Sequence, residues 1–138
     1  MTQRQSRPVR EIRINPIVPS ESVLVSTARG MRPRKAEQPV ARDRRQRVAT
    51  CPFCRGNEPM TPPTLYAWPD EKDWAIRIVE NLFPVLADDR SEGALNLGLQ
   101  QVIDGYGRHE VIIDHWNHGI ALHEMFEAHL QALAQAYR

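Results

Sequence analysis

The stretch Cys51-Pro52-Phe53-Cys54-Arg55-Gly56-Asn57-Glu58 holds both cysteines of the 138-residue chain, with two residues between them. This spacing is typical of half a tetrahedral zinc site, because a tight turn lets both thiolates reach one metal ion. Gly56 and Asn57 supply the turn, since both residue types tolerate positive φ. The five histidines all lie between residues 109 and 129. We therefore expect a metal ion to tie the middle of the chain to its C-terminal third.

Three other interpretations of the cysteine pair stay open. A redox-active Cys-x-x-Cys normally opens a helix after a strand, whereas glycine, proline and threonine follow here. A disulfide between such close cysteines would close almost no loop and add little stability. The third interpretation is two unrelated buried cysteines. The metal site is favoured over all three.

Length and composition predict one small domain, or part of one, with a modest core. No apolar run is long enough to span a membrane and no signal-peptide core begins the chain, so we expect a cytoplasmic protein without a membrane partner. The net charge of +1 hides an asymmetry: residues 1–55 carry 13 Arg and Lys against 4 acidic residues, and residues 56–138 carry 5 against 13. This split suggests an anionic ligand, or two parts that attract each other.

Alternating and β-branched residues predict four strands, at residues 11–15, 22–26, 73–80 and 109–114. In the third strand we expect Trp74, Ile76 and Ile78 to share one face. Residues 28–50 and 87–107 lack such a pattern and are predicted to be loops.

A single long helix is predicted from Leu122 to Tyr137, at the C-terminal end. Apolar residues recur there every three or four positions, at Leu122, Phe126, Leu130, Leu133 and Tyr137. Together with the strands, this helix predicts an α+β fold built on an antiparallel sheet.

Among the histidines, His118 is the strongest candidate for a third metal ligand, because it lies in a turn just beyond the last predicted strand. His109, His115 and a water molecule remain candidates for the fourth position. His123 and His129 are six residues apart and so occupy different faces of the predicted helix. We expect both to be ordinary helix residues.

Arg29 and Arg32 follow the second predicted strand. Two guanidinium groups there suit phosphate oxygens, because the planar fork binds them bidentately. A solvated basic loop is the simpler interpretation of this pair, and more so of the cluster Arg42, Arg44, Arg45 and Arg47. No nucleophile motif or glycine-rich phosphate loop is present. The residues alone predict a metal-binding α+β domain with an anion-binding loop.

Six segments and His118, taken in order, resemble the N-terminal half of the galactose-1-phosphate uridylyltransferase family, in the histidine-triad superfamily. The segments are Ile14-Asn15-Pro16, Leu24-Val25-Ser26, Ala28-Arg29-Gly30-Met31-Arg32-Pro33, residues 51–58, residues 77–84 and residues 107–114. The resemblance implies half of a histidine-triad-like transferase fold with a zinc-knuckle turn. We expect residues 11–138 to be an incomplete domain of this family, and residues 1–10 a flexible basic arm.

The resemblance implies nucleotidyl transfer between a nucleotide sugar, UDP-glucose or a similar compound, and a hexose 1-phosphate in galactose metabolism. ADP-sugars are used within the family as well. In the family a histidine attacks the α-phosphorus and carries the nucleotidyl group. By position, the resemblance implies structural zinc at Cys51, Cys54 and His118, and nucleotide-sugar contacts from Arg29, Arg32 and Asn81.

The chain also departs from the family pattern. The family's His-Pro-His segment, which holds the fourth zinc ligand and the nucleophile, lies downstream of the helix that ends here at Arg138. Before the histidine ligand, His115-Trp116-Asn117 replaces the family's Ser-Pro-Asp. We therefore predict no catalytic residue in this chain and no turnover by the chain alone. A homodimer or a complementing chain would complete it.

A zinc-stabilised module that binds nucleic acid or protein is the alternative. Residues 29–47 carry 8 Arg and Lys, which would give salt-dependent nucleic-acid binding. Only one cysteine pair is present, however, and no recognition helix carries the charge. Nucleic acid is therefore the weaker expectation.

Overall fold

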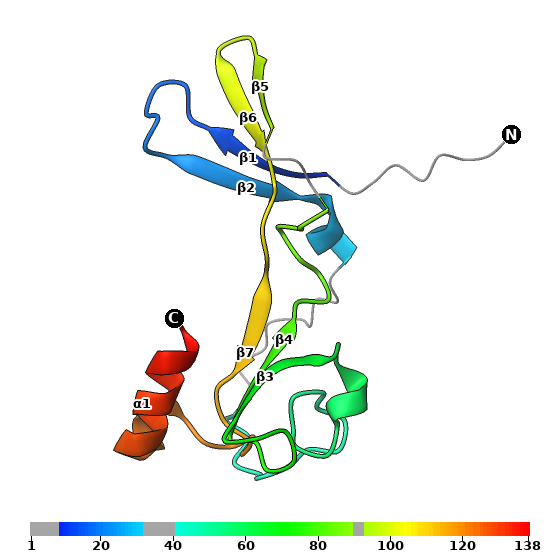
Figure 1. The fold of residues 1–138 in the computed structure, drawn as a ribbon, viewed down its shortest axis with the longest axis vertical. Helices are drawn as coiled ribbons and strands as arrows, with labels where there is room; N and C mark the ends of the chain where they lie inside the picture. The colour runs from blue at the N-terminus through cyan, green and yellow to red at the C-terminus, as the bar shows by residue number, and fades with distance from the viewer. Residues whose placement is uncertain (1–8, 32–40, 90–92) are drawn as a thin grey trace, which may run out of the picture. The chain divides into compact units, whose positions relative to one another are not determined.

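In a computed structural model, residues 9–31, 41–89 and 93–138 are described, and they form two compact units (Figure 1). The first comprises the described residues of Met1–Lys35 and Phe83–His109, and the second those of Ala36–Leu82 and Glu110–Arg138. Both contain antiparallel sheets, and an α-helix lies near the C-terminus. The predicted α+β class is confirmed. Most of the predicted basic arm, residues 1–8, lies outside the described residues.

The first unit is a four-stranded antiparallel sheet. Its order is β2-β1-β6-β5, made by β1 (Arg10–Ile14), β2 (Ser22–Ser26), β5 (Ala94–Leu97) and β6 (Gln100–Asp104). In the register, Ile12 lies opposite Leu24 on one side and Ile103 on the other. The strands predicted near residues 11–15 and 22–26 are confirmed.

The loop predicted over residues 87–107 is wrong, because β5 and β6 form a hairpin there. Leu97 pairs with Gln100 across a two-residue turn. Gly98 begins that turn with a φ of +62°, a value that glycine adopts without steric cost. The scattered glycines and acidic residues of this segment concealed the alternation of Leu95 and Leu97.

This first sheet has a shallow core. Val102 is buried, whereas Val23, Leu24, Leu95 and Leu97 are all exposed. The described part of this unit contains no α-helix that could cover a face of the sheet.

The second unit has a three-stranded antiparallel sheet in the order β3-β4-β7. The strands are β3 (Thr64–Trp68), β4 (Ile76–Glu80) and β7 (Glu110–Ile113). The central strand β4 is buried from Ile76 to Val79. β7 confirms the strand predicted at 109–114, while β4 begins three residues later than predicted. β3 was not predicted, because prolines flank its short segment on both sides.

The predicted common face of Trp74, Ile76 and Ile78 is wrong for Trp74, whereas Ile76 and Ile78 lie two residues apart in β4 and share a face. Trp74 packs with Val79 and Ile113, whereas Ile76 packs with Ala132 and Leu133 of the helix. Trp74 precedes the first residue of β4, so the two-residue alternation of a strand does not extend to it. The sheet therefore has two packed faces, and the helix covers one of them.

The helix α1 (Glu127–Ala136) lies beside the sheet of the second unit (Figure 1). It begins five residues after the predicted start, because Phe126 has extended backbone angles and a separate 3₁₀ turn covers Leu122–Glu124. The predicted apolar stripe is therefore broken: Leu133 is buried, but Leu122, Phe126 and Tyr137 are exposed. No helix among the described residues has the length and apolar character needed to cross a membrane.

Candidate metal centre

The cysteine turn is built from consecutive backbone hydrogen bonds. The N–H of Cys51 donates to the carbonyl of Val48 at 3.1 Å, that of Cys54 to Cys51 at 3.2 Å, and that of Asn57 to Cys54 at 3.0 Å. Gly56 has a φ of +89°, as the turn prediction required. Asn57 does not, since its φ is −118°.

Asn57 instead supports the turn with its side chain, which is buried. Its Nδ2 group donates to three backbone carbonyls, including those of Val48 at 3.1 Å and Cys51 at 2.7 Å. Its Oδ1 accepts a hydrogen bond of 3.0 Å from Arg47. Because buried carbonyls without partners are costly, this one amide keeps the loop before Cys51 closed.

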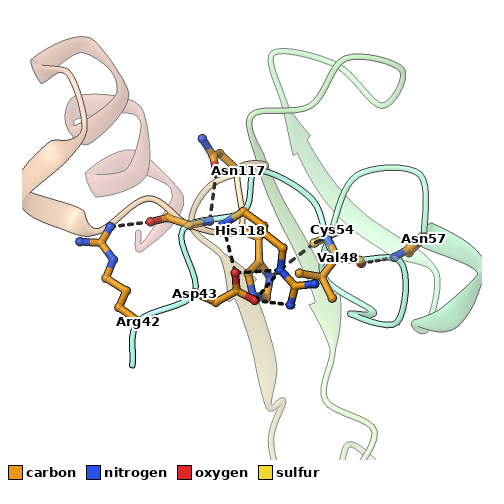
Figure 2. Close-up of polar contacts among 9 residues, drawn as sticks. Arg42, Asp43, Val48, Cys54, Asn57, Asn117 and His118 are labelled. Carbon is orange, nitrogen blue, oxygen red and sulfur yellow. Dashed lines mark hydrogen bonds and ion pairs between the residues drawn. The ribbon is translucent and has the colours of Figure 1, made fainter. Parts of the chain in front are cut away.

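His118 reaches the cysteines from the loop that follows β7. Its backbone N–H donates to the carbonyl of Gln46 at 2.9 Å, and its Nδ1 lies 3.5 Å from the Sγ atom of Cys54 (Figure 2). The ligand atoms of Cys51, Cys54 and His118 all lie within 4.8 Å of one another. The structure thus brings together the three residues that the sequence nominated as metal ligands.

The donor set fits a metal ion of the zinc type. Bond lengths of about 2.3 Å to sulfur and about 2.0 Å to nitrogen place tetrahedral ligand atoms roughly 3.5–3.8 Å apart, so the three atoms need to move little. Two thiolates and one imidazole favour zinc over magnesium or calcium, which prefer oxygen. A pocket of about 260 Å³ lies at the site, lined by both cysteines, His118 and residues of β7. Burial raises the pKa of the Cys54 thiol, so binding would displace a proton from it.

No protein-family model matches this chain. An ADP-glucose phosphorylase from Arabidopsis thaliana is 29% identical over 131 residues, which cover 93% of this chain and 37% of that protein. A solved GalT-like protein from Arabidopsis thaliana is 29% identical, with a TM-score of 0.53 over 67% of this chain and 29% of its own. The crystal structure of an ADP-glucose phosphorylase from Arabidopsis thaliana with bound ADP-glucose is 28% identical, with a TM-score of 0.52 over 95% of this chain and 36% of its own.

The chain is thus similar to an ADP-glucose phosphorylase and to a GalT-like protein. The resemblance found in the sequence is thereby confirmed. A uridylyltransferase structure shares the fold, at 24% identity and a TM-score of 0.54 over 91% of this chain and 33% of its own. The chain spans little more than a third of the curated relative that it matches.

The histidines considered for a fourth ligand make other contacts. His115 Nδ1 accepts a hydrogen bond of 2.9 Å from the N–H of Asn117, and its ring lies 4.5 Å from that of His129. His109 belongs to the first unit, where its Nδ1 accepts a hydrogen bond of 3.1 Å from Val85. Within the described ranges, three ligands converge and neither of these histidines is among them.

The two helix histidines differ from each other. His129 lies on α1, and its Nε2–H donates to the carbonyl of Asp114 at 2.7 Å, which ties the helix to the end of β7. His123 is exposed on the 3₁₀ turn before the helix. His129 therefore lies on the helix as predicted, whereas His123 lies on the 3₁₀ turn that precedes it.

The residues expected to contact a nucleotide sugar fall in different units. Arg29 lies on a 3₁₀ turn (Thr27–Met31) after β2 in the first unit, within a range predicted to be loop. Burial, followed by the charge of Arg29, lowers the pKa of His109 in the same unit. Asn81 follows β4 in the second unit and is half-buried. Arg32 lies outside the described residues.

Arg42 and Arg47 of the second arginine cluster form hydrogen bonds and ion pairs with other residues of the second unit. Arg42 pairs with Glu124 and also donates to the carbonyl of Gly119, and it lowers the pKa of Glu124 to about 2. Arg47 donates to the turn around Asn57. The four arginines of the cluster are all exposed, as the prediction of a solvated loop expected, and Arg42 and Arg47 make contacts within the unit in addition. They fasten residues 41–50 beside the histidine loop, a role that sequence spacing does not reveal.

Proposed function

We propose that this chain is the metal-stabilised, nucleotide-sugar-binding part of a nucleotidyl-transferring enzyme. The observation that carries the proposal is the convergence of Cys51, Cys54 and His118 from two distant segments. The comparisons support it, because a curated relative is named ADP-glucose phosphorylase, and a similar solved structure of an ADP-glucose phosphorylase holds bound ADP-glucose. The activity, the substrates and the partners of the whole enzyme are part of this proposal.

Zinc is the metal that we propose, in a structural role. When bound, it would cross-link the turn at Cys51 and Cys54 to the loop that carries His118, and would supply stability and no reaction step. Water would complete the coordination in this chain alone. In a longer or complementing chain, a further histidine would take that position.

The proposed nucleotide-sugar contacts are Arg29, Arg32 and Asn81. The arginines would pair with the diphosphate, since guanidinium groups bind phosphate oxygens bidentately, and Asn81 would bind the ribose. The names of the relatives make ADP-glucose the first ligand to test, and UDP-glucose, with a hexose 1-phosphate as acceptor, remains the second. Because no histidine matches the family's nucleophile, this chain would bind and not turn over without a second copy or a complementing chain.

Metal content and thermal melting test this proposal together. We expect about one zinc per chain by elemental mass spectrometry, and a melting temperature that falls when a chelator removes it. His118→Ala should abolish both the zinc and the chelator effect. His123→Ala is the matched control, because that histidine is exposed in the same unit. A wild-type chain purified without zinc, and unable to take it up, would contradict the metal centre.

Nucleotide-sugar binding is measured on the zinc-loaded chain. We expect ADP-glucose to raise the melting temperature, with Arg29→Ala and Asn81→Ala each reducing the shift. Arg108→Ala is the control, as an exposed arginine of the first unit. A larger shift with UDP-glucose would assign the uridylyl type. No shift with either nucleotide sugar would contradict the binding role and leave the metal centre standing.

A further inference from the structure

The two ring nitrogens of His118 face different groups. Nδ1 lies 3.5 Å from the Sγ atom of Cys54, on the side of the metal centre. Nε2 points the other way and lies 3.8 Å from the Oδ2 atom of Asp43 (Figure 2). The imidazole therefore stands between a prospective metal ion and a carboxylate.

Asp43 is held in place from its other side. Its Oδ1 accepts hydrogen bonds from the backbone N–H and the Nε of Arg45, at 3.0 and 2.9 Å. Its Oδ2 lies 2.5 Å from the Nη2 of Arg45. These hydrogen bonds from Arg45 fix the orientation of the Asp43 carboxylate beside His118.

The backbone also places Asp43 beside His118. The N–H of His118 donates to the carbonyl of Gln46. At Gly119, a Cβ atom would lie 2.5 Å from the carbonyl carbon of Arg44, so the two chain segments touch there. Asp43 lies on one of these segments and His118 on the other. Their approach is thus a product of close backbone packing as well as of side-chain reach.

Other carboxylates of the second unit have different partners. Glu124 pairs with Arg42, Glu58 accepts hydrogen bonds from Gly56 and Trp74, and Asp73 pairs with Arg55. In the part of the chain that the structure describes, Asp43 is the acidic residue that forms an ion-pair contact with His118.

We propose that Asp43 is a positioning residue of the metal centre, which orients His118 and holds its proton on Nε2 so that Nδ1 is free to bind the metal. The inference rests on the proposed metal site and adds the residue that tunes it. A histidine ligand must present an unprotonated nitrogen, and the partner of its other nitrogen selects the tautomer and raises the basicity of the ligating atom. Neither Asp43 nor Arg45 touches the metal in this arrangement.

Zinc affinity, measured by competition with a chromogenic chelator, is the first readout. Losing such a partner typically weakens metal binding about 10–100-fold. We expect a loss of that size for Asp43→Ala, and a smaller loss for Asp43→Asn, which keeps an oxygen near Nε2 but not the charge. Glu11→Gln is the matched control, because Glu11 also pairs with the arginine two positions further along, Arg13, but lies in the first unit.

The tautomer of His118 is the second readout. It would not change if Asp43 had only a structural role. Imidazole ¹⁵N chemical shifts should show the proton on Nε2 in the zinc-loaded wild-type chain. In the metal-free state at fixed pH, Asp43→Ala and Asp43→Asn should shift the population toward the Nδ1–H tautomer. The melting temperatures of the metal-free variants show whether the fold is intact. If Asp43→Ala fails to fold, both measurements are made on Asp43→Asn alone.

The outcomes separate the two proposals. A wild-type chain that binds no zinc would overturn the metal centre and this inference together. Zinc bound by wild type and by Asp43→Asn with equal affinity, and with an unchanged His118 tautomer, would overturn the role of Asp43 alone. An equal loss of affinity in Glu11→Gln would also overturn it, since any surface ion pair would then have the same effect.

Discussion

The guanidinium of Arg55 lies over the ring of Trp116, with its Cζ atom 5.1 Å from the ring centroid. Arg55 immediately follows Cys54, and Trp116 lies two residues before His118. This contact therefore joins the cysteine turn to the loop that carries His118, even when no metal is bound. The same guanidinium lies 5.6 Å from the ring of Trp74 and donates to the carbonyl of that residue.

Replacing Arg55 should weaken the connection between the cysteine turn and the loop that carries His118. We expect Arg55→Ala to lower the free energy of unfolding of the metal-free chain by about 1–2 kcal/mol, because the partly buried guanidinium makes two cation–π contacts that the alanine loses. Arg55→Lys should recover part of the loss, since an ammonium keeps the charge but not the planar stacking. Urea titration measures the stability of both variants. Equal stability of wild type and Arg55→Ala would contradict a stabilising role for this contact.

Gly119 is predicted to be intolerant of any side chain. A Cβ atom there would meet the backbone of Arg44 at 2.5 Å, and backbone atoms move aside at a higher cost than a side-chain tip. Gly119→Ala should therefore destabilise the chain by about 1–3 kcal/mol, the range for overpacked sites. Gly30→Ala is the control, because nothing lies within 4 Å of its Cβ position. Thermal melting decides, and equal melting temperatures for the two variants would refute the close approach.

Asn57→Asp should disrupt the cysteine turn although it changes a single atom. A carboxylate cannot donate, so the three carbonyls that Nδ2 serves would face an acceptor, while the contact from Arg47 would remain. Unsatisfied buried polar groups cost about 1–3 kcal/mol, and we expect a loss of that order in urea titration. Asn96→Asp, at an exposed strand position, should change little. A wild-type-like Asn57→Asp would show that the turn closes without this amide.

Acid should destabilise the chain through His115. Burial lowers its pKa below the ordinary value of 6.5, and the neighbouring charges of His129 and Arg55 act in the same direction, against the opposing charge of Asp114. A histidine whose pKa is lower in the folded state binds its proton more readily when unfolded. Its contribution to stability is therefore present above about pH 6.5 and is lost as the pH falls through the folded-state pKa.

The measurement is the free energy of unfolding between pH 5 and pH 7.5, with a chelator present so that loss of metal does not contribute. We expect stability to rise with pH across this window, and His115→Gln to flatten the rise. His123→Gln, at an exposed histidine, should leave the slope as it is. An unchanged slope in His115→Gln would assign the acid sensitivity to other groups.

Part of this architecture is readable in short stretches of sequence. The strands at β1, β2 and β7 follow from alternation and β-branching over four or five residues. The hairpin of β5 and β6 was missed because its segment is rich in glycine and acidic residues, and its pairing depends on a turn conformation at Gly98. The start of α1 was also missed, since the apolar spacing runs through Phe126, where the backbone is extended.

The sequence by itself determined the donor chemistry of the candidate metal centre. Cys51 and Cys54 are spaced for one metal ion, and His118, in a turn just beyond a predicted strand, was the strongest candidate for a third ligand. Only the tertiary structure decided that the three atoms meet, and that Asp43, 75 positions before His118 in the chain, lies against its far nitrogen. Local spacing sets which side chains can share a turn. The path of a loop sets which distant side chains come to face each other, and no periodic pattern in the sequence encodes that path.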